Sequence, residues 1–478
     1  MLTYTLDKNS KTPIYEQLYA AIKEDVLSGK LKSGEKLPSK RSLRDHLGIS
    51  IITIEAAYGQ LADEGYIMSS PKKGYFVLDI PGRIKKAQKP SESYGAQTGV
   101  LKKEAGTASP KLLADFASIS ADAELFPFAT WAKLLRRVIS ESPDRLLEKT
   151  DGCGAAALRK AIAAHLSDFR GMNVSAENII IGAGTEYLYS LLIQLLGRDR
   201  IYCIEDPCYS TIEKVYVLNG ACCVHARMDG HGIIPGELSE KQADIVHVSP
   251  AHHYPTGISM PASRRYELLK WVSETDGRFI IEDDYDSEFR FSGKPVPTLY
   301  SMDGSSVIYM NTFTGTLSPT IRISYMVLPD RLMEIFRKRL GFYSCTVSNF
   351  EQYTLAAFIS EGYFEKHLNR ARHAYAKRRE ALTNAVKAGP LGKYAEIYEK
   401  SPGLHFIIRF KTDLEDEALS ALFLKNGIRI YPVSGFCFSE NPGYRHCFIL
   451  SYTNIKPFEA EAVFERMASL LTLTKENK

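Results

Sequence analysis

The apolar residues of the first eighty positions recur at the spacing of short amphipathic helices. Residues 13–28 carry an apolar residue at every fourth position after Pro13, and proline favours the first turn of a helix. Two further helices are predicted behind Ser39 and Ser50, because a serine hydroxyl caps a helix N-terminus well. The segment YIMSSPKKGYFVL then indicates two short strands around a turn. Three helices followed by a β-hairpin predict a winged helix-turn-helix. Its expected buried residues are Ile14, Leu18, Ile22, Val26, Leu43, Leu47, Ile54, Ala57, Tyr58 and Leu61.

Beyond residues 1–80, which we call the head, the pattern changes twice. Residues 81–112 are rich in Lys, Gly, Ser and Ala and offer little to bury, which indicates a flexible linker, on the order of 30 Å end to end. From residue 113 onward helical patterns alternate with short apolar runs, as they do in α/β folds. The predicted organisation is a head over residues 1–80, a linker over 81–112 and an α/β domain over 113–478. A length of 478 residues agrees with more than one domain.

Composition adds a few exclusions. The chain has 45% hydrophobic residues, as a globular protein does, yet no run of about 18 apolar residues, so no membrane span is expected. The N-terminus has no apolar stretch typical of a secretory signal, and the cytoplasm is the expected location. Eight cysteines show no paired metal-binding spacing, so we expect reduced packing residues and no metal site. A net charge of +4 is too small to indicate a partner.

The head contains a candidate DNA-binding surface, although its net charge indicates nothing, since residues 1–80 hold 11 Lys and Arg against 10 Asp and Glu. Basic residues bracket the start of the second helix and lie at the hairpin turn, where DNA phosphates would be met. The start of the third helix is expected to face base edges. The candidate DNA-binding residues are Lys36, Ser39, Lys40, Arg41, Arg44, Ser50, Thr53, Lys72 and Lys73. Helix-turn-helix shapes also serve as protein-docking modules, and that alternative stays open.

The stretch GEKLPSKRSLRDHLGIS, followed by TIEAAYGQLADEGYI and KKGYFV, resembles the N-terminal domain of the GntR family of bacterial transcription regulators. This resemblance spans most of the head and implies binding to double-stranded DNA. It departs at Ile51 and Ile52, where relatives often carry a base-contacting arginine and a polar residue. A DNA-binding domain with fewer polar side chains at these positions would depend more on contacts with phosphates and on DNA shape.

Four segments of the α/β region place polar residues where a phosphorylated cofactor could be held. IIIGAGTEYLYSLLIQLL (179–196) predicts a strand, a glycine turn and a helix whose N-terminus attracts phosphate. IYCIEDPCYS (201–210) offers a tyrosine ring after a strand, and FIIEDDYDSEF (279–289) ends a buried strand in carboxylates, which need a cationic partner. NTFTGTLSPTIRISY (311–325) places hydroxyl residues ahead of an arginine. Taken singly, each segment is also compatible with ordinary surface loop chemistry.

In this order, and together with LFPFATW, SPAHHYPTG and GLHF, these segments resemble the fold-type I aminotransferase domain. Joined to a GntR-like head, they make the chain similar to the MocR subfamily, which implies a pyridoxal 5′-phosphate site. By that resemblance Asp283 would pair with the pyridine nitrogen, Tyr285 would bond the phenolic oxygen, and Tyr209 would stack on the ring. The residues expected to hold the phosphate are Thr185, Glu186 (through its amide), Thr312, Thr314 and Arg322, whose guanidinium suits bidentate contact.

The reactive lysine of the resembled family is missing from this chain. Gly315 stands where relatives have the lysine that forms a Schiff base with the cofactor, and no lysine lies between Lys294 and Lys338. Glycine has no amine, and an arginine guanidinium stays protonated, so neither can replace it. Two further positions, Asn454 and Ile119, also differ from the arginine and glycine usual in relatives. We therefore expect a catalytically inactive domain.

The expected function is that of a DNA-binding transcription regulator whose aminotransferase-like domain senses a small molecule. Pyridoxal phosphate, or its adduct with an amino acid, would bind without a covalent bond; a different effector and a purely structural dimerisation domain are the alternatives. A homodimer is expected because fold-type I sites lie at a subunit boundary, and two heads then bind two half-sites. A protein-interaction scaffold and an active aminotransferase are the competing functions.

Overall fold

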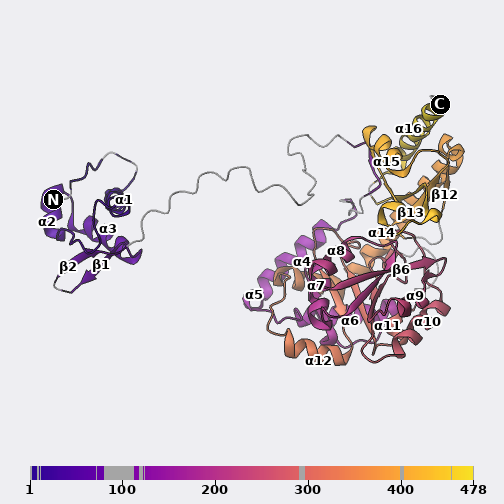
Figure 1. The fold of residues 1–478 in the computed structure, drawn as a ribbon, viewed down its shortest axis with the longest axis horizontal. Coiled ribbons are helices and arrows are strands. Elements are labelled where there is room, and N and C mark those ends of the chain that lie inside the picture. Colours follow the sequence, from indigo (N-terminus) through magenta and orange to yellow (C-terminus); the bar gives the residue numbers. More distant parts are fainter. Residues whose placement is uncertain are drawn as a thin grey trace. The chain divides into compact units, whose positions relative to one another are not determined.

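The computed structural model describes residues 3–7, 10, 12–71, 73–79, 112–117, 122, 124–289, 297–398, 403–453 and 455–476. The chain divides into two compact units, Met1–Gly106 and Thr107–Lys478 (Figure 1). The predicted linker lies outside the described residues except for residue 112. The boundaries proposed from the sequence pattern therefore stay predictions.

The first unit is a winged helix-turn-helix, as the pattern predicted. Its helices are α1 (Ile14–Leu27), α2 (Lys40–Leu47) and α3 (Ile51–Asp63), and an antiparallel hairpin follows with β1 (Ile67–Ser70) and β2 (Gly74–Val77). Both predicted caps are present. The hydroxyl of Ser39 accepts from the Ser42 amide and that of Ser50 accepts from the Thr53 amide, each at 3.1 Å.

The core of this unit consists of the residues that helical spacing selected. Eight of them are buried, while Ile14 and Leu47 are partly buried and pack against the same cluster. The Tyr58 hydroxyl donates to the Pro38 carbonyl at 3.0 Å, which ties α3 to the turn before α2. This contact and the shared core fix the start of α3 relative to α2.

An eight-stranded sheet forms the centre of the second unit, in the order β4-β11-β10-β9-β8-β5-β6-β7. The strands are β4 (Ile179–Gly182), β5 (Ile201–Asp206), β6 (Cys222–Asp229), β7 (Gly232–Ile233), β8 (Ile245–Val248), β9 (Phe279–Asp283), β10 (Val307–Thr312) and β11 (Ser324–Val327). Five neighbours, from β10 to β6, run parallel, whereas β11 is antiparallel to both β10 and β4, and β7 to β6. Parallel strands share one edge for their carboxyl ends, and ligand sites of α/β sheets form at that edge.

Helices cover both faces of this sheet. Alternate residues of one strand therefore point into different apolar clusters, one on each face. In β4, Ile179 and Ile181 belong to one apolar cluster and Ile180 to another. The helices of this part of the chain are α4 (Phe128–Glu141), α5 (Pro143–Leu147), α6 (Ala156–Arg170), α7 (Thr185–Leu196), α8 (Thr211–Leu218), α9 (Pro235–Glu240), α10 (Ala262–Ser273), α11 (Leu299–Met302), α12 (Asp330–Arg339) and α13 (Asn349–Ser360), of which α4 and α5 pack on α13. Short 3₁₀ turns lie at Ala176–Asn178 and Ser287–Phe289. The predicted α/β class is confirmed.

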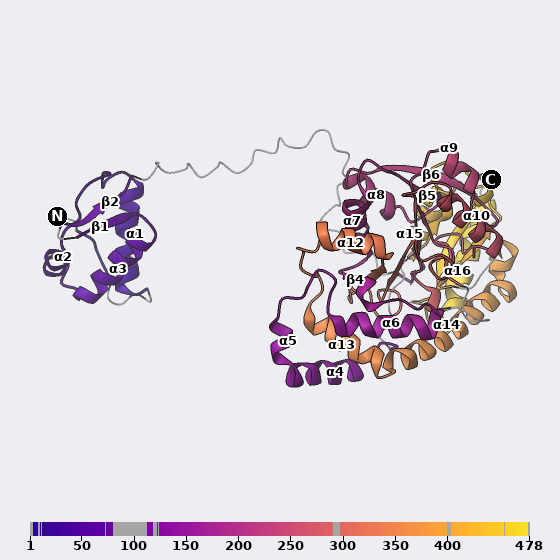
Figure 2. The ribbon, with the colours of Figure 1, turned by 90° about the horizontal axis from the view of Figure 1, so that it is seen from below.

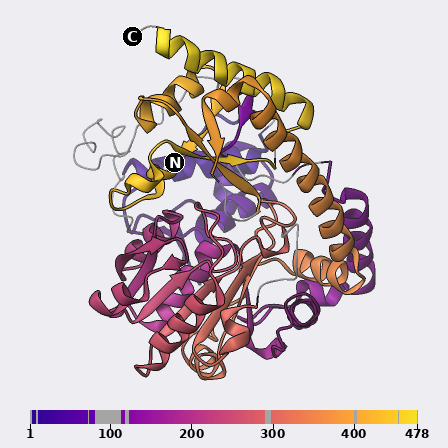
Figure 3. The ribbon, with the colours of Figure 1, turned by 90° about the vertical axis from the view of Figure 1, so that its right-hand side faces the viewer.

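A smaller antiparallel sheet, β12-β13-β16-β15, completes the second unit. Its strands are β12 (Ala395–Ile397), β13 (His405–Phe410), β15 (Tyr431–Pro432) and β16 (Cys447–Ser451), and a separate parallel pair joins β3 (Ala114–Asp115) to β14 (Ile428–Arg429). The remaining helices are α14 (Tyr363–Ala388), α15 (Asp416–Lys425) and α16 (Pro457–Glu476), with 3₁₀ turns at Pro390–Lys393, Val433–Phe436 and Pro442–Tyr444. The long helix α14 runs along one side of the unit from α13 to the small sheet (Figures 2 and 3).

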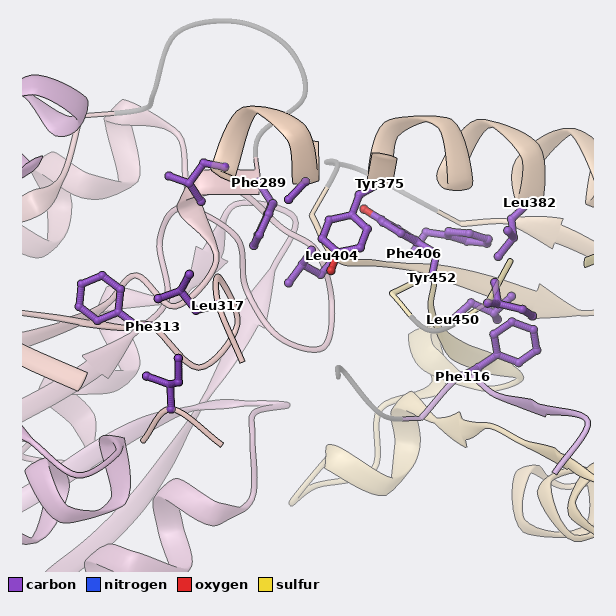
Figure 4. Close-up of a cluster of buried hydrophobic side chains, with 14 of the residues drawn as sticks. Phe116, Phe289, Phe313, Leu317, Tyr375, Leu382, Leu404, Phe406, Leu450 and Tyr452 are labelled. Carbon is purple, nitrogen blue, oxygen red and sulfur yellow. The ribbon is translucent and has the colours of Figure 1, made fainter. Parts of the chain in front are cut away.

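One apolar cluster joins the two sheets (Figure 4). Phe313 and Leu317, from the loop after β10, belong to the same buried group as Phe406 and Leu450 of the small sheet. Leu404, just before β13, is also part of it and is 1% exposed. The loop that carries Gly315 is therefore held between the two sheets by its apolar residues.

Among the described residues, no helix is long and apolar enough to cross a membrane. All eight cysteines are free thiols. Three of them, Cys203, Cys208 and Cys447, are buried as expected of packing residues, but Cys222 is exposed, so the packing interpretation is wrong there.

Candidate functional site

A cavity of about 350 Å³ lies at the carboxyl ends of the parallel strands. Residues at or just beyond the ends of β5, β8, β9 and β10 line it, together with the start of α7 and Leu404. All eight residues that the sequence analysis selected for a cofactor line this one cavity: Thr185, Glu186, Tyr209, Asp283, Tyr285, Thr312, Thr314 and Arg322. Segments up to 137 positions apart in the chain thus meet at one edge of the sheet.

Asp283 ends β9 and is 6% exposed. Its Oδ2 accepts a hydrogen bond from the Tyr189 hydroxyl at 2.6 Å and lies 3.5 Å from Nε2 of His247. Its Oδ1 is buried and has no hydrogen-bond partner within the described part of the chain. An unpaired buried carboxylate oxygen is unfavourable by about 1–3 kcal/mol or more. A cationic N–H donor in the cavity would satisfy it.

Two neighbours of Asp283 were missed by the sequence analysis. Tyr189 lies one helical turn after Thr185 on α7, and burial, reinforced by the Asp283 charge, raises its pKa well above the usual range, so it stays a donor. His247, within β8, packs edge-on against Tyr189 and its Nδ1 lies 2.7 Å from the Tyr216 hydroxyl. Spacing of four from Thr185 could have indicated Tyr189, and a histidine inside the apolar run IVHV could have indicated His247.

At the opposite end, the hydroxyl residues form a connected group. Thr312 Oγ1 donates to Thr314 Oγ1 at 2.9 Å and accepts from the Ser324 hydroxyl at 2.8 Å. The Thr314 amide also donates to Thr312 Oγ1 at 3.1 Å. These contacts fix the hydroxyls beside the N-terminus of α7, where backbone amides attract anions.

Arg322 lies against the same helix end and donates to the Glu186 carboxylate at 2.7 Å. Both side chains are close to half exposed. Gly184, with φ of +91°, makes this approach possible, because a Cβ there would meet the guanidinium at 2.3 Å. The cation expected to hold a phosphate is therefore present, but its charge is already paired.

The two tyrosines expected around a ring differ in exposure. Tyr209 is 45% exposed and meets Tyr254 edge-on, with ring centroids 6.1 Å apart. Tyr285 is half-buried, and its hydroxyl lies 3.3 Å from Nδ1 of His252. Burial raises the pKa of the Tyr285 phenol well above its usual range, so this group is neutral and can donate.

Gly315 also lines the cavity. A Cβ built on it would lie 3.6 Å from the Tyr285 carbonyl oxygen and 4.0 Å from Leu404 Cδ1, which are ordinary contacts. Its φ lies outside the left-handed region, so neither space nor backbone conformation requires glycine there. None of the described lining residues is a lysine.

Glu205 is a further cavity group that the sequence analysis did not select. Burial raises its pKa to about 8, and the nearby Asp283 charge adds to the shift. Its Oε2 accepts from the Ser249 amide at 3.0 Å and lies 3.4 Å from His253, whose pKa burial lowers to about 3. Near neutral pH the cavity therefore holds an uncharged carboxylic acid beside an uncharged imidazole.

In the head, the candidate DNA-binding residues lie around the starts of α2 and α3 and at the hairpin. Lys36, Ser39, Arg41, Arg44, Ser50 and Lys73 are exposed, and Lys40 and Thr53 are half-buried. Some of their charge is already paired, since Lys40 Nζ lies 3.0 Å from Glu55 Oε1 and Arg44 donates to Asp45 at 2.8 Å. Three positions singled out from the sequence, Lys72, Ile119 and Asn454, lie outside the described residues.

The chain is similar to known proteins in both of its units. Residues 14–77 match the family described as bacterial regulatory proteins, gntR family. The chain is 36% identical to the uncharacterized HTH-type transcriptional regulator YhdI of Bacillus subtilis, over 92% of each chain. It is 32% identical to the probable rhizopine catabolism regulatory protein MocR of Rhizobium meliloti, over 95% of this chain and 92% of that one.

Two more distant similarities are to a further regulator and to the fold of an enzyme. The HTH-type pyridoxine biosynthesis transcriptional regulator PdxR of Corynebacterium glutamicum is 28% identical over 85% of each chain. The structure of an archaeal alanine:glyoxylate aminotransferase superposes with a TM-score of 0.68 and 22% identity, over 76% of this chain and 91% of that one. The second unit thus has an aminotransferase-like fold.

Proposed function

The chain belongs to the MocR-type transcription regulators with a GntR head, and from that premise we propose that it binds DNA and senses a phosphorylated pyridine without transforming it. DNA binding and an aminotransferase-like domain follow from the family and the fold. Ligand sensing without turnover is the part that we propose. The protein would lie in the cytoplasm, as expected of a regulator that acts on bacterial DNA.

The observation that carries this proposal is the unpaired Oδ1 of Asp283 in a cavity lined by all eight selected residues. Pyridoxal 5′-phosphate fits this donor set, because its protonated ring nitrogen supplies the cationic donor that Asp283 lacks. Tyr285 would donate to the phenolic oxygen and Tyr209 would cover the ring. The phosphate would meet Arg322, the hydroxyls of Thr185, Thr312 and Thr314, and the Glu186 amide. When bound, the cofactor supplies an electrophilic aldehyde and an electron-withdrawing ring.

The absence of turnover rests on Gly315. Without an amine at this position, the chain has no group there to bond the aldehyde or to move a proton at the adjoining carbon. Arg322 cannot take that role, because a guanidinium stays protonated and is a poor nucleophile. The residues of the cavity would therefore bind and orient the ligand, or its adduct with an amino acid. They would also exclude water from the end of the cavity that holds Asp283, which we call the ring end.

We also propose a homodimer. The helices α4, α5 and α13 pack on one another (Figure 2), and each carries an exposed large apolar residue: Phe128, Leu147 and Phe350. Phe342, in the segment between α12 and α13, is exposed as well. Leu147 is 83% exposed, and exposed apolar groups of this kind mark contact surfaces. Two copies joined there would carry two heads for two half-sites.

The test combines a ligand titration with DNA binding. Purified protein is titrated with pyridoxal phosphate and followed by absorbance and thermal shift, before and after borohydride treatment. We expect saturable binding with a raised Tm, full release of the ligand on denaturation after borohydride, and retardation of DNA from the gene's own upstream region at low salt. Turnover together with a borohydride-fixed ligand would refute the proposal, as would the absence of both thermal shift and DNA retardation.

A further inference from the structure

The outward face of α3 begins with polar side chains that are already engaged. Ser50 accepts from the Thr53 amide at 3.1 Å, and the two hydroxyls lie 2.8 Å apart. Glu55 pairs with Lys40 at 3.0 Å. One turn later, Gln60 donates to Glu64 at 3.1 Å. Few hydrogen-bonding groups on this face are left for base edges.

Apolar atoms occupy the positions between them. Ile52 is 73% exposed, the highest value for a large apolar residue among the described residues of the head. Ala56 is also exposed and lies four residues further on, so both share one face of the helix. Ile52 is the second residue of α3, and in helix-turn-helix proteins the N-terminal residues of the recognition helix contact base edges.

We propose that Ile52, extended by Ala56, reads thymine through its 5-methyl group in the major groove. That methyl is the one apolar feature that a base pair presents there, and apolar side chains are its matching contact. This inference rests on the proposed DNA binding and adds what the head recognises. It predicts operators with thymines at the positions that face the start of α3.

Replacing thymine by uracil tests the contact, because uracil lacks only the 5-methyl group and keeps the hydrogen-bonding edge. The full chain is titrated against its own upstream region, amplified once with dTTP and once with dUTP, in gel retardation. We expect the unmodified chain to bind the uracil fragment roughly tenfold more weakly, because burying one methyl group is worth roughly fourfold in affinity and a dimer makes the contact in both half-sites. Ile52→Ala leaves only Ala56 and a shortened side chain, so it should lose most of the thymine preference and bind both fragments near the level of the unmodified chain on uracil DNA.

Two variants serve as controls. Ile52→Val keeps a branched side chain and should retain most of the thymine preference. Leu218→Ala removes a leucine that is even more exposed, at 86%, on α8 of the other unit, and it should leave the preference unchanged. Because Ile52 is exposed, its substitution should not alter the Tm, which separates a lost contact from a lost fold.

The outcomes are distinguishable. If the unmodified chain binds both fragments equally, this inference fails and DNA binding stands. If Ile52→Ala keeps the full thymine preference, the assignment to thymine also fails. If no chain retards either fragment, the proposed function and this inference fall together.

Discussion

The ring end and the phosphate end of the cavity hold their charges differently. At the ring end, Asp283 is buried, one of its oxygens accepts from Tyr189 at 2.6 Å, and the other has no partner in the described chain. At the phosphate end, Arg322 and Glu186 are each close to half exposed and pair with one another at 2.7 Å. One end presents a buried carboxylate with an unpaired oxygen, and the other presents a half-exposed ion pair.

This difference indicates where a ligand would gain most. A cationic donor at Asp283 completes a buried group, and charge-assisted hydrogen bonds in such places are strong. A phosphate at Arg322 must instead replace a carboxylate that is already there, under solvent screening. We infer that affinity comes mainly from the ring end, while the residue at position 315 decides whether the ligand is held covalently.

Adding a lysine at Gly315 should have the largest effect. The space around a Cβ there is ordinary, so Gly315→Lys should fold and place an amine in the cavity. We expect pyridoxal phosphate to become bonded to the new side chain and to stay with the denatured chain after borohydride reduction. Mass spectrometry of the peptide carrying residue 315 measures this all-or-none change.

The matched control is Gly236→Lys, because Gly236 is exposed and a Cβ there meets nothing within 4 Å. It adds the same amine outside the cavity and should not be labelled at its peptide. If Gly315→Lys binds the ligand reversibly but is never labelled, then Gly315 does not face the aldehyde, and the assumed orientation between the two ends is wrong.

Removing the charge at the ring end should have the next largest effect. Asp283→Asn keeps the shape and the contact with Tyr189 but cannot pair with a protonated ring nitrogen. We expect affinity for pyridoxal phosphate, measured by absorbance titration, to fall roughly ten- to a hundredfold, the range for a hydrogen bond to a charged group. Tyr189→Phe should lose less, because it leaves the charge in place. Equal affinity for Asp283→Asn and the unmodified chain would show that the ring end is not the main anchor.

Much of the fold could be predicted because its signals are local. Caps at Ser39 and Ser50 and the buried face from Ile54 to Leu61 follow from residue type and helical spacing within a few positions. The cofactor residues could be selected because their segments resemble the fold-type I aminotransferase domain, and the fold brings these segments to one cavity at the carboxyl ends of the parallel strands.

The rest depends on contacts between distant segments. Tyr189 and His247 lie inside apolar runs that favour a buried helix or strand, and Glu205 is followed by Asp206 at the end of β5. Their place in the cavity follows from the packing of α7, β5 and β8. The ion pair between Arg322 and Glu186 likewise depends on contacts between distant segments. Arg322 and Glu186 are far apart in the chain, and no local pattern shows that the expected phosphate ligand is already bound to a carboxylate.

Burial at the ring end should also appear in the pH dependence of stability. Burial raises the Glu205 pKa to about 8 from an ordinary 4.5, so Glu205 contributes stability that is full below pH 4.5 and is lost as pH rises through 8. His253, which faces it, is neutral above about pH 3. Glu205→Gln removes this loss, so its Tm relative to the unmodified chain should increase from pH 5 to pH 9.

Thermal unfolding at pH 5, 7 and 9 measures this difference, which we expect to reach a few degrees at pH 9. Glu334→Gln changes an exposed glutamate on α12 and should show no such trend. A Tm difference for Glu205→Gln that does not vary with pH would mean that the ring end is wetter than its burial indicates.

The smallest effect should come from the phosphate end, and it should be a gain. Glu186→Gln removes the carboxylate that pairs with Arg322 at 2.7 Å but keeps the backbone amide at the start of α7. An exposed pair of this kind is worth little, so we expect pyridoxal phosphate to bind roughly two- to fivefold more tightly. Because both side chains are close to half exposed, salt should reduce the gain. Pyridoxal without its phosphate should bind the variant and the unmodified chain alike. Weaker binding of the phosphorylated ligand would instead show that Glu186 holds Arg322 in position, and the phosphate end would then be preorganised like the ring end.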